Sequence, residues 1–328
     1  MRRHLLDRLM LEQIMALSPR GRLRSSGELA DGLDQGGERN ASGAARRRGL
    51  AKGVGQEGMA LDLAHGSAGA LLALLHLHRV APDANPNGDR PLELARACAE
   101  HLLRQRVSPS GAPRAWPYEY GETPLCGLAH GASGIACALL RLHRETGDPE
   151  LLAAAHEGMA YERQHYTAPP GEWQDLRDPD TRRFTTAWCH GSPGIALARL
   201  EALEFGESED ENASDFADDL DKALATTRNP ELDPVDHLCC GNAGRIEVLL
   251  SAHRSLQDVS LRTEAEALER KLRRRAEGSA EESEGRYRWS EEDPEAFVPG
   301  LMVGAAGLGY TLLRLEDETA LPGVLLLR

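Results

Sequence analysis

A short glycine-containing phrase recurs five times in this chain and constrains its fold more than any other feature. The copies read LAHGSAG at 63–69, LAHGASG at 128–134, WCHGSPG at 188–194, HLCCGNAG at 237–244 and MVGAAG at 302–307. The residues directly before the first glycine of each copy are His65, His130, His190, Cys240 and Val303. These positions are separated by about 50 to 65 residues, which is enough chain for two helices per repeat. The repetition therefore predicts an architecture built from one helical unit.

Apolar and amphipathic segments alternate between the copies. Dense apolar runs without proline follow the glycines at 70–79, 135–144, 195–204 and 245–254, and their helix-forming residues predict helices. Segments with apolar residues at three- and four-residue spacing lie at 90–105, 150–164, 214–227 and 261–275. Each of these predicts an amphipathic helix with one buried face. The alternation predicts an all-α fold, an α/α toroid with an inner and an outer ring, in which the glycine turns gather at one end of the inner ring.

Composition and charge narrow the classes of function. With 41% hydrophobic and only 4% aromatic residues, the core must consist mostly of Leu, Ala and Val. The formal net charge of −14 argues against nucleic-acid binding and favours a cationic peptide as partner. No apolar run approaches the roughly 18 residues that span a bilayer, and the N-terminus lacks the apolar core of a secretory signal. We therefore expect a cytoplasmic protein with no membrane span.

Some segments do not follow the repeat. Residues 1–58 predict an N-terminal helix and then a flexible, basic segment rich in Gly, Arg and Ser, so that the repeat domain comprises residues 59–328. The segments 171–187 and 283–300 predict long loops or short hairpins ahead of an inner helix. Loops of this length in a compact domain are often functional.

Three cysteines stand directly before glycine turns. The chain has only six in total, which favours thiols, metal ligands or core residues over a disulfide framework. Cys189 precedes the third turn, and Cys239 and Cys240 precede the fourth, each where a helix N-terminus supports a thiolate. If the two turns are neighbours, three thiolates converge, which is the number of protein ligands in a catalytic zinc site. The alternative is that the cysteine pair packs as two small buried residues. Cys126 and Cys137 are expected in the core.

The phrases WCHGSPGIALARL, LCGLAHGASGIACALLRL, HLCCGNAG and PGLMVGAAGLGYTLLRL together resemble the lanthionine synthetase cyclase (LanC-like) family. They are most similar to the C-terminal cyclase domain of class II lanthipeptide synthetases (LanM), over roughly residues 59–328. The resemblance implies an α/α toroid that holds one zinc ion through Cys189, Cys239 and Cys240. Most relatives carry Cys-His at the last pair, and the Cys-Cys form resembles one branch of the family.

The resemblance also implies a set of catalytic residues. His130 matches the family's active-site histidine, whose ordinary pKa range suits general acid/base work. Asp62 matches an acidic position of relatives and is expected to orient or tune His130. His190, beside Cys189, is expected to influence the metal indirectly. Two further histidines are assigned structural roles, His65 at the first turn and His237 as a surface or capping residue.

The implied reaction is an intramolecular Michael addition. A cysteine thiol of a precursor peptide attacks dehydroalanine or dehydrobutyrine in the same peptide and forms a (methyl)lanthionine ring. The implied partners are a dehydrated precursor peptide and a separate dehydratase domain or protein.

The chain also departs from the family pattern. Five motif-bearing repeats are found where the family toroid has seven inner helices, so we expect an incomplete ring. This leaves a second hypothesis, a truncated, catalytically impaired zinc-binding remnant that binds precursor peptide. A third hypothesis, a carbohydrate-active α/α-toroid enzyme, predicts paired carboxylates at the toroid mouth, whereas these turns carry His and Cys.

Overall fold

The computed structural model describes residues 60–81, 90–118, 123–205, 212–282 and 298–326. These belong to one compact unit, Ala60–Arg328. The predictions for residues 1–58 and for most of 283–300 lie outside the described residues. Within the described ranges, no helix is both long enough and apolar enough to cross a membrane.

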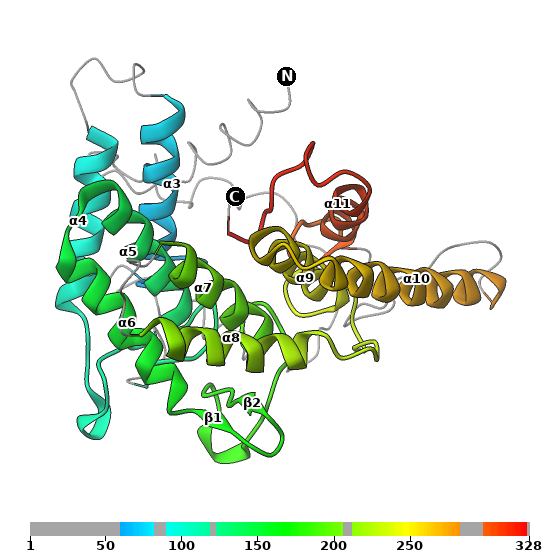
Figure 1. The fold of residues 1–328 in the computed structure, drawn as a ribbon, viewed down its shortest axis with the longest axis horizontal. Helices are drawn as coiled ribbons and strands as arrows, with labels where there is room; N and C mark the ends of the chain where they lie inside the picture. Colours follow the sequence, from blue (N-terminus) through cyan, green and yellow to red (C-terminus); the bar gives the residue numbers. More distant parts are fainter. Residues whose placement is uncertain (1–59, 82–89, 119–122, 206–211, 283–297, 327–328) are drawn as a thin grey trace, which may run out of the picture. The chain divides into compact units, whose positions relative to one another are not determined.

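Helices form two layers that alternate along the chain (Figure 1). The inner layer, as far as it is described, consists of α3 (Ser67–Val80), α5 (Ala132–Thr146), α7 (Ser192–Phe205), α9 (Asn242–Leu256) and α11 (Ala305–Glu316). The outer layer consists of α4 (Arg90–Arg104), α6 (Pro149–Arg163), α8 (Ala213–Thr227) and α10 (Val259–Glu282). Each outer helix packs on the inner helix that precedes it, and consecutive inner helices pack side by side. The predicted α/α-toroid arrangement of helical hairpins is confirmed, with one inner helix for each of the five glycine phrases.

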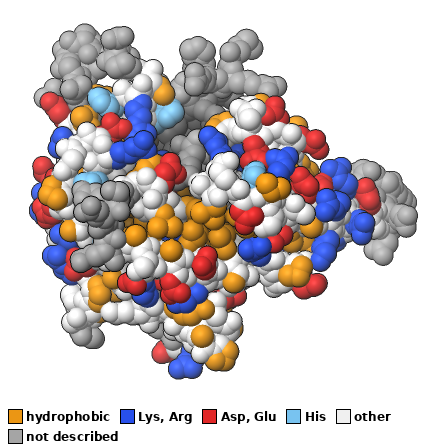
Figure 2. Space-filling view, viewed as in Figure 1, with side chains coloured by type: hydrophobic (Ala, Val, Ile, Leu, Met, Phe, Trp, Pro, Cys, Tyr) orange, Lys and Arg blue, Asp and Glu red, His pale blue; other side chains and the backbone are white. Residues whose placement is uncertain are grey.

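Burial explains why the two helix classes differ in sequence. Nearly every residue of α5 from Ala132 to His143 is buried, because this helix lies between α3, α7 and its own outer partner α6. The outer helix α4 instead buries Ala95, Ala99 and Leu102, which are spaced as one stripe of a helix. On the face of the molecule shown in Figure 2, acidic and basic side chains are mixed, and apolar side chains gather near the centre.

The remaining regular structure is short. Strands β1 (Tyr166–Thr167) and β2 (Glu172–Trp173) form an antiparallel pair between α6 and α7. Single turns of 3₁₀ helix occur at Pro109–Gly111 and Pro179–Thr181. Of the long loop or short hairpin expected at 171–187, only the second strand of a hairpin falls in that segment, because β1 lies wholly before it.

The glycine phrases are tight reversals that could not accept a side chain. At Gly191 the backbone φ is +135°, a conformation that other residues rarely adopt. At Gly134 an added Cβ would overlap the carbonyl oxygen of Leu128 and would lie 2.9 Å from the Leu63 Cβ of the preceding repeat. The first glycine lets the chain turn into the helix, and the second lets neighbouring repeats approach each other.

A ladder of backbone hydrogen bonds joins the five turns in series. The amide of Ala64 donates to the carbonyl of Ala129 (3.1 Å), and Ala129 donates to Cys189 (3.2 Å). Cys189 then donates to Cys239 (3.4 Å), which donates to Met302 (2.8 Å). All five residues stand two places before the first glycine of their phrase. The ladder therefore fixes the register in which equivalent side chains of adjacent turns face one another.

Candidate metal centre and active site

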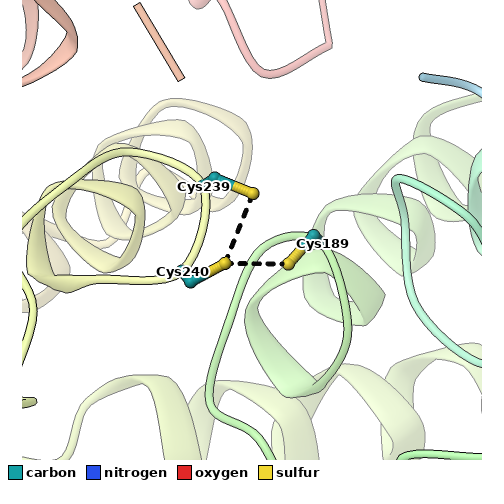
Figure 3. A group of neighbouring side chains, drawn as sticks. All are labelled: Cys189, Cys239 and Cys240. Atoms are coloured by element: carbon teal, nitrogen blue, oxygen red, sulfur yellow. Dashed lines mark hydrogen bonds between the residues drawn. The ribbon is translucent and has the colours of Figure 1, made fainter. Parts of the chain in front are cut away.

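Three sulfur atoms converge between the third and fourth turns (Figure 3). Cys189 Sγ lies 3.2 Å from Cys240 Sγ, which lies 3.4 Å from Cys239 Sγ. Cys189 is buried, and the two vicinal cysteines are partly exposed. The ladder bond from Cys189 to Cys239 explains the convergence, because it places the two cysteine-bearing turns next to each other.

The donor set fits a thiolate-bound metal. Tetrahedral zinc with Zn–S bonds of about 2.3 Å separates its sulfurs by about 3.8 Å, and here all three lie within 4.8 Å of one another. Hydrogen bonding among the three thiols lowers the pKa of Cys240 to about 3 and raises the pKa of Cys239. Without a metal ion, one of these thiols therefore loses its proton only while a neighbouring thiol keeps its own. A dication would allow all three to be thiolates.

Three histidines from successive glycine turns lie in a row that ends at the sulfur cluster. His65, His130 and His190 occupy the position directly before the first glycine of the first three phrases, and Cys240 occupies it in the fourth. The rings of His65 and His130 stack with centroids 5.3 Å apart, and those of His130 and His190 stack at the same distance. Exposure falls along the row, because the side chain of His65 is 68% exposed, that of His130 is 18% exposed and His190 is buried.

His130 is held by Asp62 from the neighbouring turn. His130 Nδ1 lies 2.8 Å from Asp62 Oδ2, while Asp62 Oδ1 accepts the His65 amide at 2.7 Å. Burial by itself raises the pKa of Asp62, but the hydrogen bonds from His130 and His65 outweigh it and lower that pKa. An ionised Asp62 favours the tautomer of His130 that carries its proton on Nδ1, which leaves Nε2 available to a substrate.

His190 lies in a different environment although its position in the repeat is equivalent. Burial, the charge of Arg177 and the neighbouring His130 lower its pKa to about 4. This imidazole is therefore neutral at neutral pH. The predicted indirect role of His190 is compatible with its place beside Cys189.

Sequence reasoning missed Arg177, which lies in the loop predicted to be functional. Its guanidinium binds the carboxylate of the buried Asp175 through Nε and Nη2 at 2.9 and 2.6 Å. Burial alone would raise the pKa of Asp175, but the hydrogen bonds from Arg177 lower it to about 2. The loop thus supplies an ion pair whose guanidinium interacts electrostatically with Cys189, Cys240 and His190. The only sequence signal was the length of the loop.

Sequence reasoning also missed the support of the His130 turn. Glu162, on outer helix α6, accepts the backbone amides of Gly127 and Ser133 at 2.9 and 3.0 Å and the Ser133 hydroxyl at 2.5 Å. Arg199 of α7 binds the same carboxylate at 3.1 Å, and both side chains are fully buried. This buried acid therefore fixes the backbone on both sides of His130.

The structure brings all six predicted site residues to the turn end of the inner layer, in two groups. One is Cys189, Cys239 and Cys240, and the other includes Asp62 and His130, with His190 stacked between them. His237 is buried, so the predicted surface position is wrong. Its Nδ1 accepts the Cys240 amide at 3.2 Å, which agrees with the capping alternative and braces the cysteine turn. Cys126 and Cys137 are buried in the core, as predicted.

Comparison with known proteins decides the family. The family described as "Lanthionine synthetase C-like protein" matches residues 38–326. The chain belongs to this family. The LanC-like chain is also 32% identical over 77 residues to the lacticin 481/lactococcin biosynthesis protein LcnDR2 of Lactococcus lactis subsp. lactis. That match covers 24% of the chain and spans 8% of the length of the relative.

Among solved structures, this LanC-like chain is similar to nisin cyclase. The TM-score is 0.55 at 19% sequence identity, over 87% of this chain and 73% of the other. At this identity the likeness establishes the fold, and it agrees with the helical layers described above. Members of the LanC-like family generally bind zinc, and the three cysteines are a donor group suited to it.

Proposed function

We propose that this LanC-like chain is a zinc-dependent cyclase that forms (methyl)lanthionine thioethers in a dehydrated precursor peptide. The observation that carries the proposal is the convergence of three sulfurs from two adjacent turns, with a histidine held by a carboxylate one repeat away. Cys189, Cys239 and Cys240 would hold the zinc ion. When bound there, zinc would supply Lewis acidity that favours the thiolate form of an incoming peptide thiol.

His130 and Asp62 handle the proton. The unprotonated Nε2 of His130 accepts the proton that leaves the peptide thiol, and Asp62 stabilises the resulting imidazolium through Nδ1. The sulfur then forms a bond to the β-carbon of the dehydroamino acid, and the electrons of the carbon–carbon double bond pass to an enolate. His130 returns the proton to the α-carbon. No proton is gained or lost overall, so one acid/base group is sufficient.

Other residues arrange these groups. Glu162 keeps the turn of His130 in place, and the Arg177–Asp175 pair places a cation on the side of the cysteines. A positive charge near the site stabilises negative charge that develops on the substrate carbonyl. The substrate must arrive already dehydrated, so a dehydratase domain or protein would supply it.

The test is a thiol count on a dehydrated precursor peptide. Purified protein with one equivalent of zinc is incubated with the peptide, and free thiols are alkylated and counted by mass spectrometry. We expect the loss of one thiol for each ring formed. Cys240→Ser should abolish this loss, and His130→Gln should lower its rate about 10²–10⁴-fold. The partly exposed Cys98 lies on α4 outside the site, and Cys98→Ser serves as the matched control. Stoichiometric zinc without any thiol loss would instead favour the catalytically impaired remnant.

A further inference from the structure

A second group of potential metal ligands lies one repeat away from the cysteines and contains no sulfur. Asp62 and His65 come from the first glycine turn, and His130 comes from the second. One donor atom of each lies within 4.8 Å of the other two. Two imidazoles and one carboxylate form a donor set that suits zinc and other divalent transition metals.

Of two distances between potential ligand atoms, one is shorter and the other longer than in a tetrahedral zinc site. Ligands about 2.0–2.1 Å from zinc lie about 3.3 Å from one another. Here Asp62 Oδ2 is 2.8 Å from His130 Nδ1 and 3.9 Å from His65 Nδ1. Both imidazoles present the same type of nitrogen to one carboxylate oxygen. Adjustments of roughly half an ångström would bring these two pairs of atoms to tetrahedral spacing.

The group is held together before any ion arrives. The other carboxylate oxygen of Asp62 accepts the His65 amide, which directs Oδ2 toward the imidazoles. The ladder bond from Ala64 to Ala129 fixes the two turns relative to each other. The rings of His65 and His130 stack within 19° of parallel, so the exposed His65 ring must turn for both imidazole planes to contain one ion. Because the side chain of His65 is 68% exposed, an ion can enter from solvent.

We propose that Asp62, His65 and His130 form a second, thiol-free binding site for a divalent transition-metal ion. This assigns His65 a ligand role in place of the structural role expected from the sequence. An ion bound there takes both Asp62 Oδ2 and His130 Nδ1, and so replaces the hydrogen bond between them. One consequence rests on the proposed function, namely that metal in excess of one equivalent slows cyclisation because His130 loses its carboxylate partner.

The binding itself can be tested without a cyclisation assay by titrating metal-free protein with Co²⁺. Thiolate ligands give Co²⁺ an intense charge-transfer absorption in the near ultraviolet, whereas nitrogen and oxygen ligands contribute only weaker visible bands. We expect two binding events, of which only one adds charge-transfer absorption. His65→Ala should weaken the thiol-free event about tenfold or more while the thiolate event persists. Cys240→Ser should have the opposite effect, and His78→Ala, which changes a histidine farther along α3, should leave both events intact.

The outcomes separate this proposal from the proposed function. A single event that carries charge-transfer absorption overturns the second site and leaves the cysteine site standing. An undiminished second event in both His65→Ala and Asp62→Asn also overturns it, because the ion then binds elsewhere. Loss of the second event in those two variants with retention in His78→Ala supports it, whether or not the protein cyclises peptides. His65→Gln repeats the test with a side chain of similar size, which excludes unfolding as the cause.

Discussion

Replacement of Glu162 tests whether the outer layer holds the catalytic turn. In Glu162→Ala, the amides of Gly127 and Ser133 lose their acceptor, and the fully buried Arg199 keeps only Asp219 as a carboxylate partner. Removal of one partner of a buried ion pair costs about 3–5 kcal/mol, and Arg199 then retains only the compensation that Asp219 supplies. In a domain of this size each kcal/mol lowers the melting temperature by about 2–4 °C, so we expect a fall of roughly 6–20 °C.

The same helix provides a matched control. Glu157 binds two arginines, Arg106 and Arg114, but it lies nearer the surface with 25% of its side chain exposed. Pairs that reach solvent contribute about 0.2–1 kcal/mol, and of these three side chains only Arg106 is buried, so Glu157→Ala should shift the melting temperature by only a few degrees. Thermal unfolding of both variants at saturating zinc measures the difference. Equal shifts for the two variants would refute the reasoning that burial makes Glu162 the more costly residue to lose.

Three further predictions concern the sulfurs and the loop. Cys240→His should retain one equivalent of zinc but slow cyclisation, because one thiolate fewer leaves the bound ion less electron-rich; equal or faster thiol loss would contradict this. Removal of zinc with a chelator should lower the melting temperature, since an ion at 1,000 times its Kd stabilises by about 4 kcal/mol, whereas an unchanged temperature with the cysteines intact would exclude a metal at this site. The pKa of Asp175 is lowered from 3.8 to about 2, so its contribution of about 1–2 kcal/mol is present above pH 4 and is lost as the pH falls toward 2. Arg177→Met should flatten acid unfolding in that window, and an unaltered acid profile would show that the pair contributes nothing.

The sequence predicted the parts of this protein that depend on local patterns. Runs such as 135–144 lie within helices because their spacing and helix-forming residues act over a few neighbours. The phrase spacing predicted one inner helix per repeat, and the three cysteines of two adjacent phrases meet as expected. Equivalent positions in a repeat come to equivalent places in the fold, so the convergence of the cysteines followed from counting along the chain.

The contacts that the sequence did not predict join residues from different elements. Glu162 lies on an outer helix, and nothing in its own segment distinguishes it from the acids that face solvent on that helix. Its partner Arg199 lies on an apolar inner helix, where a charge has no local explanation. Stacking of His65 on His130 depends on the separation of two turns, which tertiary packing sets. These features required three-dimensional coordinates because their cause is the arrangement of repeats.

The hydrogen-bonded ladder has a consequence for how the chemistry of such a protein can change. Since main-chain hydrogen bonds set the register of the turns, each turn offers side-chain positions whose occupants can be exchanged without changing that register. The cysteine cluster uses Cys189 of the third glycine turn and the two residues before the first glycine of the fourth. The equivalent two residues of the third turn are Cys189 and His190. A single change, Ala129→Cys, would complete a set of two thiols and one imidazole one repeat earlier. The two alternative sets would share Cys189, and a titration with one equivalent of Co²⁺ would reveal which of them takes the ion.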